Sequence, residues 1–320
     1  MAADVPDGDF AHRKASGIDV VICTYRSSAH ILACLDSLRA STSVSSTTVV
    51  DNASDDGTSE LVADHCASAQ VVRMGYNAGF ARAVNRGLRV GNSRYVFVLN
   101  PDTVVEEGTL QTLLEFAELH TDAGVVAPRL VYGDGRDQLT ARAFPAAAAG
   151  LFGRRSPLTR LMPNNRWSAR YLSERRHTGA TPFEVDWVSG AAMLLPRCVI
   201  DEVGGLDEGF FLFWEDADWC RRIKDAGYKV WCVPSAVVVH HEGGSRGFGW
   251  NSLTIRSFHR GAYRYWCKHH APQVWNPLRW VAGTLLAGRA AALLARSRLS
   301  APARSTDRRP ETAERRRLVP

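Results

Sequence analysis

A five-residue apolar run at Tyr95–Leu99 is the sequence feature that most constrains the fold of this chain. Uncharged aromatic and β-branched residues in such a run are typical of a strand buried on both faces of an α/β sheet. The run ends in Asn100-Pro101-Asp102, and the strand must stop there because Pro101 has no N–H to donate to a neighbouring strand. Ligands of open α/β sheets bind beyond the carboxyl ends of the strands, so Asp102 is a candidate ligand-binding acid. The alternative is a simple polar turn, because Asn, Pro and Asp all favour turns.

Strand-like and helix-like segments alternate along the first hundred residues. β-rich segments at 18–23, 47–50 and 71–74 are each followed by apolar residues at helical spacing, which predicts helices at 30–40, 58–66 and 80–88. Repeated strand–helix alternation predicts a largely parallel sheet with right-handed crossovers.

The remainder of the chain continues this pattern less regularly. We expect an amphipathic helix at 107–119, a strand from 125, a turn into a buried strand over 183–195 and a short helix at 197–203. A helix begins near 215 and ends near 226, because Gly227 favours a helix stop, and strands are predicted at 229–233 and 236–239. No elements are assigned to 133–182, which either supplies the acceptor side of a site or is a disordered insertion.

Composition and cysteine usage favour a protein of the cytoplasm. A chain of 320 residues suits one large α/β domain with appendages or two smaller domains. Its seven cysteines include no CxxC pair, so reduced thiols are expected rather than a disulfide framework or a zinc site. Residues 1–17 lack the apolar core of a signal peptide and are expected to form a flexible leader. No uncharged apolar run reaches the length of a membrane span.

Positive charge is concentrated at the C-terminal end of the chain. Residues 245–320 carry a net charge of +12, whereas residues 1–244 carry −6. Within this quarter, residues 275–299 combine Leu, Val and Trp with four arginines, the pattern of an amphipathic helix that lies on an anionic membrane surface. The alternatives are a helix packed on the core or on the partner in a homodimer. No nucleic acid is expected as a partner, because aromatic residues are not interleaved with the terminal arginines.

Two acids follow predicted strands directly. Asp51 comes after one strand and Asp102 after another, so we expect neighbouring strand ends to point both carboxylates into one crevice. Asp51 has the chemistry to accept hydrogen bonds from a pyrimidine N–H or a ribose hydroxyl. Gly75 and Gly79 let the backbone approach a diphosphate closely. The alternative is an Asx-rich loop that caps the following helix.

Two further clusters carry acid–base or metal-ligand groups. Glu215, Asp216 and Asp218 open a predicted helix, where the helix dipole favours carboxylates, so each is either a cap or a general base held ionised near neutral pH. His240 follows a predicted strand and is a candidate metal ligand, although a histidine standing alone is more often structural.

Taken together and in order, these motifs resemble those of family 2 inverting glycosyltransferases. The matching segments are VVICTYRS at 20–27, VVDNASDDGT at 49–58, GYNAGFARAVNRG at 75–87, YVFVLNPDT at 95–103, VSGAAMLLPR at 188–197, GGLDEGFFLFWEDADWCRR at 204–222 and HHEGGS at 240–245. Within the family, the chain looks most like bacterial rhamnosyltransferases that act on diphospho-polyprenol-linked sugars. The resemblance implies a GT-A fold, in which helices flank a Rossmann-like, mostly parallel central sheet.

The resemblance also implies a role for each matching residue. Thr24, Tyr25 and Asp51 hold the nucleoside of a nucleotide-sugar donor, Asn77 and Gly79 line its diphosphate, and Asn100 and Asp102 occupy the two acid positions of the family's DxD motif. Asp102 and His240 hold Mg²⁺ or Mn²⁺, and Asp216 is the catalytic base. Asn100 departs from the acid usual at its position and is a poorer ligand for a hard cation. The sugar and acceptor pocket is expected to draw on Trp187, Ser189, Gly190, Trp214 and Glu215.

These implications define an expected enzyme and its organisation. Residues 18–265 form the GT-A domain, divided into a nucleotide-binding half at 18–103 and an acceptor half at 104–265, followed by a basic helical segment at 266–300 and a disordered tail at 301–320. The enzyme is expected to transfer L-rhamnose from dTDP-rhamnose to a lipid-linked saccharide in cell-envelope polysaccharide assembly. It would act in the cytoplasm, peripherally bound to the inner face of the cell membrane. Alternatives are another donor, such as UDP-galactofuranose or a UDP-hexosamine, or a non-catalytic nucleotide-binding scaffold.

Overall fold

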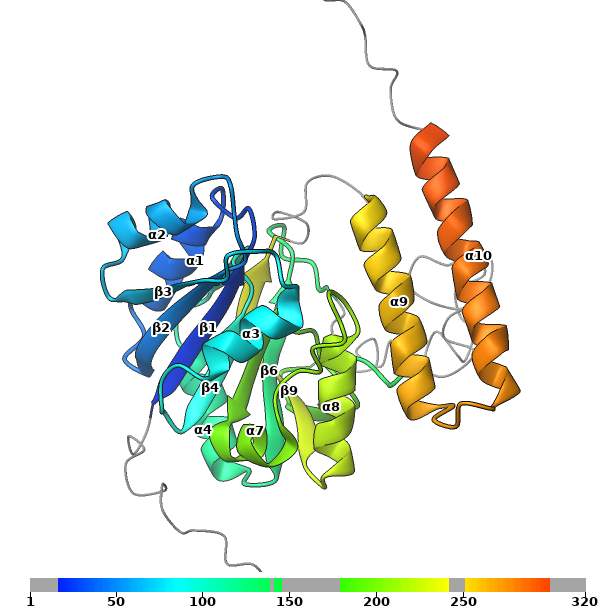
Figure 1. Cartoon of the computed structure of the whole chain (residues 1–320). Helices are drawn as coiled ribbons and strands as arrows, with labels where there is room; N and C mark the ends of the chain where they lie inside the picture. Colours follow the sequence, from blue (N-terminus) through cyan, green and yellow to red (C-terminus); the bar gives the residue numbers. More distant parts are fainter. Residues whose placement is uncertain (1–16, 139–140, 146–178, 242–250, 300–320) are drawn as a thin grey trace, which may run out of the picture.

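The computed structural model describes residues 17–138, 141–145, 179–241 and 251–299, and its strands form one mixed sheet with helices on both faces (Figure 1). The strand order is β3-β2-β1-β4-β8-β6-β9-β5, and β7 pairs with β9. The strands are β1 Ile18–Thr24, β2 Val44–Asp51, β3 Ala69–Arg73, β4 Tyr95–Leu99, β5 Thr103–Val105, β6 Ala123–Val131, β7 Phe183–Val185, β8 Ala192–Pro196 and β9 Lys229–His240. The helices are α1 Ile31–Leu38, α2 Thr58–His65, α3 Phe80–Leu88, α4 Thr109–Leu119, α7 Arg197–Val203, α8 Glu215–Asp225, α9 Ser252–His269 and α10 Pro277–Leu299.

The first half of the sheet is parallel, as the strand–helix alternation predicts. β1 pairs in parallel with β2 on one side and with β4 on the other, and β2 pairs in parallel with β3. All residues of β1 and β4 are buried, because helices cover both faces of this part of the sheet. One expectation is corrected here: the strands that precede Asp51 and Asp102 are not neighbours, because β1 lies between them.

Alternate residues of the central strands build two separate cores. Val21, Val96 and Val98 face α3, α7 and α8, whereas Ile22, Phe97 and Leu99 face α1 and α4. Successive side chains of a strand point to opposite faces, so the continuous apolar runs supply both cores at once.

The second half of the sheet is mixed. β8 runs antiparallel to both β4 and β6, β5 and β7 run antiparallel to β9, and β6 and β9 are parallel. Six of the nine described strands therefore run in one direction, which confirms the mostly parallel sheet. The carboxyl ends of β1, β2, β4 and β9 and the amino ends of β5 and β8 meet at one edge, which we call the ligand edge.

Four elements differ from the predictions. The first is β7, a strand at Phe183–Val185 where a turn was expected. The two strands predicted at 229–233 and 236–239 are one strand, β9, whose pairing with β6 skips from Val233 to Val237. Pro234 lies in this irregularity, where its missing N–H breaks no regular ladder. The short strand β5 and the long helix α9 were not predicted. α9 opens at Asn251, whose side chain accepts a hydrogen bond from Thr254 N at 2.9 Å.

Helices α9 and α10 form a hairpin beside the core, next to α8 (Figure 1). Gly283 of α10 faces Tyr263 of α9 so closely that an added Cβ would lie 3.3 Å from the tyrosine ring. α9 runs without interruption through residues 265 and 266, where the expected division between domain and helical segment falls. Residues 1–16, the expected tail at 301–320 and most of the unassigned segment 133–182 lie outside the described residues.

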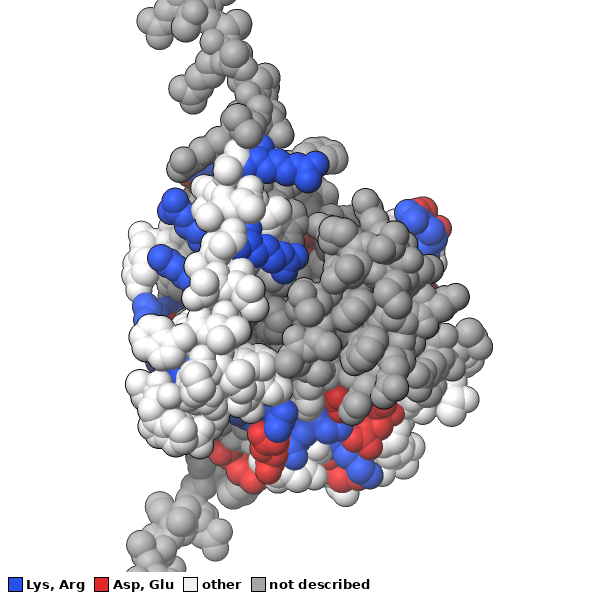
Figure 2. Space-filling view, turned by 90° about the vertical axis from the view of Figure 1, so that its right-hand side faces the viewer, with Lys and Arg blue, Asp and Glu red and all other residues white. Residues whose placement is uncertain are grey.

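Helix α10 presents a basic and apolar surface. Within the described residues, Pro277–Ser297 is the one helix long and apolar enough to cross a membrane by length and composition, although Arg279, Arg289 and Arg296 interrupt it. Trp280 is 72% exposed and Leu285 is 68% exposed. Figure 2 shows this face of the molecule, where arginines lie among uncharged side chains along α10 and acidic residues gather away from it.

Candidate active site

Thr24 and Asp51 lie side by side at the ligand edge. They are partners in the parallel register of β1 and β2, and Thr24 Oγ1 donates to Asp51 Oδ1 at 3.1 Å. Ser54 N donates to the other carboxylate oxygen of Asp51 at 3.2 Å, and Ser54 Oγ also donates to Asp51 Oδ1. Burial, followed by the charges of Asp51 and Glu215, raises the pKa of the nearby Cys23 thiol to about 12. Thr24 and Asp51 thus form a fixed acidic corner, and their role in nucleoside binding stays a prediction.

Asn52 holds the glycine-bearing turn against this corner, and the sequence reasoning missed it. Its Oδ1 accepts from Ala78 N at 2.8 Å, and its Nδ2 donates to Gly79 O at 3.2 Å. Both ends of one buried amide therefore fix the backbone of the turn. The sequence signal was present, because Asn52 immediately follows Asp51 in the Asx-rich loop, but that loop appeared equally suited to cap the next helix.

Gly79 occupies a position that a larger residue would not tolerate. Its φ is +88°, and an added Cβ would lie 2.6 Å from Phe211 O. Asn77 Oδ1 accepts from Gly79 N at 3.1 Å, and Phe80 N donates to Phe211 O at 2.8 Å. The turn expected to line a diphosphate is therefore also packed against the segment that leads into α8.

Tyr25 lies in the turn that follows Thr24. It is partly exposed, and the Arg26 guanidinium lies 5.4 Å from the centre of its ring. Arg26 is held in place by an exposed ion pair with Asp55 at 2.6 Å. The structure therefore leaves Tyr25 accessible beside the Thr24–Asp51 corner.

Asp102 and His240 come together, although 138 positions separate them in the sequence. Thr103 and His240 are partners in the β5–β9 register, and His241 N donates to Asp102 O at 2.8 Å. His240 Nε2 lies 3.4 Å from Asp102 Oδ1, and both side chains are only 7% exposed. Nε2 is buried without a hydrogen-bond partner. A buried histidine nitrogen that makes no hydrogen bond and lies beside a carboxylate oxygen is suited to bind a divalent cation together with that oxygen.

A metal at this position would complete its coordination from outside the protein. Among the described residues, no group of three or more His, Cys, Asp or Glu side chains is arranged to hold a metal ion. Mg²⁺ commonly takes one or two protein ligands together with substrate phosphates and water, so two protein ligands are compatible with such a site. Asn100 lies at the end of β4, with its backbone N donating to Ala191 O at 2.9 Å and its backbone O accepting from Thr103 Oγ1 at 2.7 Å.

The loop before β8 links the Asn100–Asp102 turn to Asp216. Ala191 accepts the hydrogen bond from Asn100, and the preceding residue, Gly190, donates its N–H to Asp216 Oδ2 at 3.1 Å. A Cβ on Gly190 would lie 3.4 Å from Asp216 Cβ and 3.6 Å from the Phe80 ring. Asp216 therefore lies at the same edge as Asp51, the last residue of β2, and Asp102, which follows β4.

The environment of Asp216 gives it the properties of a base. Burial raises the pKa of the Asp216 carboxyl, while hydrogen bonds from Gly190 N and Ala217 N and the charge of Arg142 act against the rise. We expected the helix start to favour the ionised form, and burial outweighs that effect. A carboxylate whose pKa moves up from the ordinary value toward neutrality accepts protons more readily. It keeps its geometry because both oxygens accept from backbone N–H groups.

Strained backbone surrounds these residues. Among the described residues, the non-glycine positions with positive φ are Arg26, Ala53, Phe213 and Trp214. Arg26 lies after β1, Ala53 lies after β2, and Phe213 and Trp214 lie directly before α8. Each of these loops contains or adjoins a predicted site residue. Such conformations cost of order 1–3 kcal/mol each and concentrate at functional sites.

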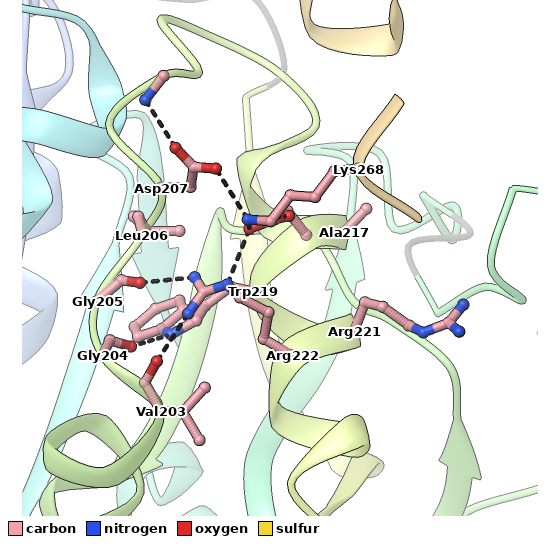
Figure 3. A network of polar contacts seen from close by, with 12 residues as sticks. Val203, Gly204, Gly205, Leu206, Asp207, Ala217, Trp219, Arg221, Arg222 and Lys268 are labelled. Carbon is pink, nitrogen blue, oxygen red and sulfur yellow. Dashed lines mark hydrogen bonds and ion pairs between the residues drawn. The ribbon is translucent and has the colours of Figure 1, made fainter. Parts of the chain in front are cut away.

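Helix α8, which carries Asp216, is fixed by a network of polar contacts (Figure 3). Trp219 Nε1 donates to Gly204 O at 2.9 Å, and Arg222 donates to Val203 O at 3.0 Å. Lys268 of α9 donates to Asp207 at 2.8 Å and lies 2.8 Å from Asp218.

Asp218 has a structural role. It is fully buried, and it accepts from Arg222, Lys268 and His269. Burial raises the pKa of Asp218, but the hydrogen bonds from His269, Lys268 and Arg222 more than offset this, and the net pKa is lowered. Of the three acids at the start of α8, Asp218 is therefore committed to holding α9, and Glu215 and Asp216 remain as candidates for chemistry.

The expected sugar and acceptor residues occupy different environments. Trp187 is 7% exposed, its Nε1 donates to Ala143 O at 3.0 Å, and Arg142 lies 5.0 Å from its ring centre. Glu215 is also buried, whereas Ser189 and Trp214 are partly exposed. Trp214 packs on Phe258 and Tyr265, with ring centres 5.5 Å apart in each case. Gly190 contacts Asp216 directly, whereas Trp187 is mainly a core residue.

Known proteins are similar to this chain in sequence and in fold. Residues 19–192 match the model of glycosyl transferase family 2. The chain is 32% identical over 275 residues to N-acetylglucosaminyl-diphospho-decaprenol L-rhamnosyltransferase of Mycobacterium tuberculosis, covering 82% of this chain and 88% of the relative. It is 25% identical to rhamnosyltransferase WbbL of Escherichia coli, covering 54% of this chain and 62% of that protein.

Solved structures with low sequence identity share the architecture. Mannosyltransferase PcManGT of Pyrobaculum calidifontis, solved with GDP-Man and Mn²⁺, matches with a TM-score of 0.53 at 17% identity, over 90% of this chain and 81% of its own. GalNAc-T7, solved with UDP, GalNAc and Mn²⁺, matches with a TM-score of 0.58 at 16% identity, over 79% of this chain and 50% of its own. The family match, the identity to a curated relative and the shared fold lead to one conclusion: the chain belongs to glycosyl transferase family 2 and is a glycosyltransferase with the GT-A fold.

Proposed function

We propose that this enzyme transfers L-rhamnose from dTDP-rhamnose to a hydroxyl of a lipid-linked, polyprenyl-diphosphate saccharide, with inversion at the anomeric carbon. The relative from Mycobacterium tuberculosis, by its name, acts on a GlcNAc-diphospho-decaprenol acceptor, and the similarity covers most of both chains. The observation that carries the proposal is the joining of Asp216, through Gly190 and Ala191, to the turn that bears Asp102.

Asp216 is the proposed base. Its carboxylate takes the proton of the acceptor hydroxyl as that oxygen attacks the anomeric carbon of the donor, and the bond from this carbon to the nucleoside diphosphate breaks. One displacement from the opposite face inverts the configuration. The raised pKa and the two backbone hydrogen bonds of Asp216 support this role, because a base needs both proton affinity and a fixed position.

The donor binds along the ligand edge in this proposal. Thr24, Tyr25 and Asp51 hold the nucleoside, and Asn77 and Gly79 line the diphosphate. Asn100 follows β4, the strand that pairs with β1, and would contribute to the donor side as well. Ser189, Gly190, Trp214 and Glu215 contribute to the sugar and acceptor side, and Trp187 supports that side from the core.

A divalent cation, Mg²⁺ or Mn²⁺, is the proposed cofactor. Asp102 and His240 would hold it, and the unpartnered, buried His240 Nε2 supports this assignment. When bound, the cation would neutralise charge on the departing nucleoside diphosphate.

The C-terminal hairpin is the proposed membrane-binding part of the enzyme. Outward-facing apolar residues on α10, together with Arg289 and Arg296, match the chemistry of an anionic bilayer surface. The enzyme would then lie peripherally on the inner face of the cell membrane, next to a polyprenyl-linked acceptor. A chain that lacks residues 275–320 should move from the membrane to the soluble fraction, and unchanged fractionation would contradict this location.

The alternative to peripheral binding is that α10 crosses the membrane. The length and composition of Pro277–Ser297 satisfy both arrangements. Extraction of membranes at alkaline pH separates them, because a peripheral protein is released and a spanning protein is retained.

A panel of nucleotide sugars tests the proposed reaction. Purified enzyme is incubated with dTDP-rhamnose, UDP-galactofuranose or a UDP-hexosamine and a GlcNAc-diphospho-polyprenol acceptor, and release of free nucleotide is measured with and without chelator. We expect acceptor-dependent release from dTDP-rhamnose that the chelator abolishes. Release from a different donor alone would replace the sugar assignment, and release insensitive to chelator would contradict the cofactor assignment.

A further inference from the structure

A turn after β6 brings a buried glutamine to the proposed metal ligand. Gly135 N donates to Tyr132 O and Tyr132 N donates to Arg136 O, both at 2.8 Å, so the chain reverses directly after β6. Gln138 N then donates to Leu130 O at 2.9 Å. The Gln138 side chain, which is 2% exposed, lies against His240. No role considered so far uses Gln138, which lies in a segment where the sequence predicted no structure.

Both ends of the Gln138 amide contact His240. The Nε2 amide group donates to the His240 backbone oxygen, and Oε1 lies 2.8 Å from His240 Nδ1. Nε2 of Gln138 also lies 3.4 Å from Val131 O. Two carbonyl oxygens can only accept hydrogen bonds, so the NH₂ group of Gln138 must face them. This fixes Oε1 toward the ring of His240.

The orientation of this amide determines the tautomer of the histidine. Oε1 can only accept, so the Nδ1 of His240 must carry the proton that it donates to Oε1. In the neutral ring the lone pair then lies on Nε2, which is the buried atom without a hydrogen-bond partner, 3.4 Å from Asp102 Oδ1. Two acceptor atoms face each other across this gap. Such an arrangement is favourable when a cation lies between them.

We propose that Gln138 is a positioning residue that holds His240 in the Nδ1–H tautomer and thereby presents Nε2 to the divalent cation; the metal role rests on the proposed function. Hydrogen bonds to the far nitrogen of a metal-binding histidine fix its tautomer and ring orientation, and their loss typically lowers metal affinity about 10- to 100-fold. The competing role for Gln138 is purely structural, since it also ties the β6 turn to the end of β9. The state of the His240 ring distinguishes the two roles.

The first measurement is the tautomer of His240 in the metal-free, full-length enzyme. Nitrogen-15 NMR of the imidazole rings is recorded at about pH 8.5, well above the ordinary histidine pKa of about 6.5. The His240 signals are assigned by their loss in His240→Ala. We expect a protonated Nδ1 and an unprotonated Nε2 in the wild type. We expect a mixture of tautomers in Gln138→Met, which keeps the shape of the side chain but removes its acceptor and donor.

The second measurement is Mn²⁺ affinity by electron paramagnetic resonance in the presence of dTDP. Gln138→Met should bind about 10- to 100-fold more weakly than the wild type. Gln138→Glu keeps an acceptor for Nδ1–H and should retain the tautomer and most of the affinity. Its second oxygen faces the carbonyl oxygens of Val131 and His240, so its free energy of unfolding should fall. Gln111→Met is the matched control, because Gln111 also uses both ends of its amide, accepting from Ser43 and donating to Glu115, but lies on α4 away from the site. It should change neither the tautomer nor the Mn²⁺ affinity.

Failure of this inference can be told from failure of the proposed function. A wild-type ring protonated on Nε2, or a Gln138→Met variant with unchanged tautomer and unchanged Mn²⁺ affinity, would overturn the inference alone. A wild type that has the expected tautomer but binds no Mn²⁺ would overturn the cofactor assignment together with the ligand role of Nε2. If Gln138→Met does not fold, the His240 ring of the wild type still tests the inference, because protonation on Nε2 would overturn it.

Discussion

The ligand edge and the α9–α10 hairpin use charged residues in opposite ways. At the ligand edge, hydroxyl and backbone N–H groups hold the carboxylates of Asp51 and Asp216, and the described contacts of these carboxylates include no ion pair. At the hairpin, cations hold the acids: Lys268 reaches both Asp207 and Asp218. The charges of the hairpin therefore stabilise the fold, whereas those of the edge remain for a ligand or a proton.

The outward surfaces of the two regions differ as well. The residues of the edge are fixed by buried hydrogen bonds, whereas α10 exposes Trp280, Leu285 and several arginines to its surroundings. An exposed apolar and basic face of this kind marks a site that binds a membrane or another protein. We therefore expect the ligand edge to carry out catalysis and the hairpin to bind the membrane. Each variant below tests one of these two roles.

The largest effect is expected from Asp216→Asn. Removing a general base typically lowers the rate 10²- to 10⁴-fold, and we expect kcat to fall about a thousandfold while the Kd for donor is unchanged. Thermal stability should fall slightly, because the amide nitrogen of the new Asn faces one of the two backbone N–H groups that donate to the carboxylate. Asp225→Asn, at the other end of α8, is the control and should retain activity. Wild-type kcat in Asp216→Asn would contradict the base assignment.

Protonation of Asp216 should reproduce that loss reversibly. Burial raises the pKa of Asp216 above its ordinary value of 3.8, and only the ionised form can take a proton. The value of kcat/KM should therefore rise with pH through a pKa above that of an ordinary aspartate. A profile that stays flat down to the ordinary aspartate pKa would show that another group is the base.

Asp218→Ala should cause the largest loss of stability. The substitution removes a fully buried acid and leaves Arg222, Lys268 and His269 without it. Breaking a buried ion pair costs about 3–5 kcal/mol in the free energy of unfolding, measured by denaturant titration. Asp134→Ala breaks the exposed pair with Arg136 and should cost at most about 1 kcal/mol. Equal losses in the two variants would contradict the structural role of Asp218.

Asp218 should also make stability depend on acidity. Its pKa is lowered in the folded state, so its ionised form contributes stability above the ordinary aspartate pKa of 3.8. That contribution is lost as the pH falls from this value through the lower, folded-state pKa. Asp218→Ala should show a smaller fall in unfolding free energy over this acid range than the wild type does.

Asn52→Ala should have an intermediate effect on the donor side. It leaves Ala78 N without its partner, which costs about 1–3 kcal/mol of unfolding free energy, while Gly79 O keeps the hydrogen bond from Ala83 N. Donor affinity, measured by calorimetry, should fall because the turn at Gly79 loses its support. Asn92→Ala changes an exposed asparagine and is the control. Undiminished donor affinity would separate Asn52 from the binding site.

The smallest effects are expected on the hairpin. Each cation near an anionic membrane contributes about 1 kcal/mol, so Arg289→Gln or Arg296→Gln should weaken binding to vesicles containing anionic lipid about fivefold. Arg136→Gln, an exposed arginine on the β6 turn, should have no effect. Sedimentation with vesicles measures the difference, and equal binding by all three variants would contradict a membrane role for the α10 arginines.

The sequence by itself determined the local elements and the order of the motifs. The helix Phe80–Leu88 and the strand Tyr95–Leu99 have the predicted bounds, because apolar spacing and the stops at Gly79 and Pro101 are local signals. The family was also evident from motifs that span most of the chain, and the comparisons confirm it.

Tertiary structure decided which of those residues meet. Only the insertion of β1 between β2 and β4 separates Asp51 from Asp102, and only the β5–β9 pairing brings His240 to Asp102. The sequence contains no signal for the roles of Asp218 and Gln138 and an ambiguous one for Asn52, because each role depends on partners that are distant in the sequence. Local patterns report what a segment prefers to become, whereas burial, pKa shifts and hydrogen-bond partners arise from contacts between segments.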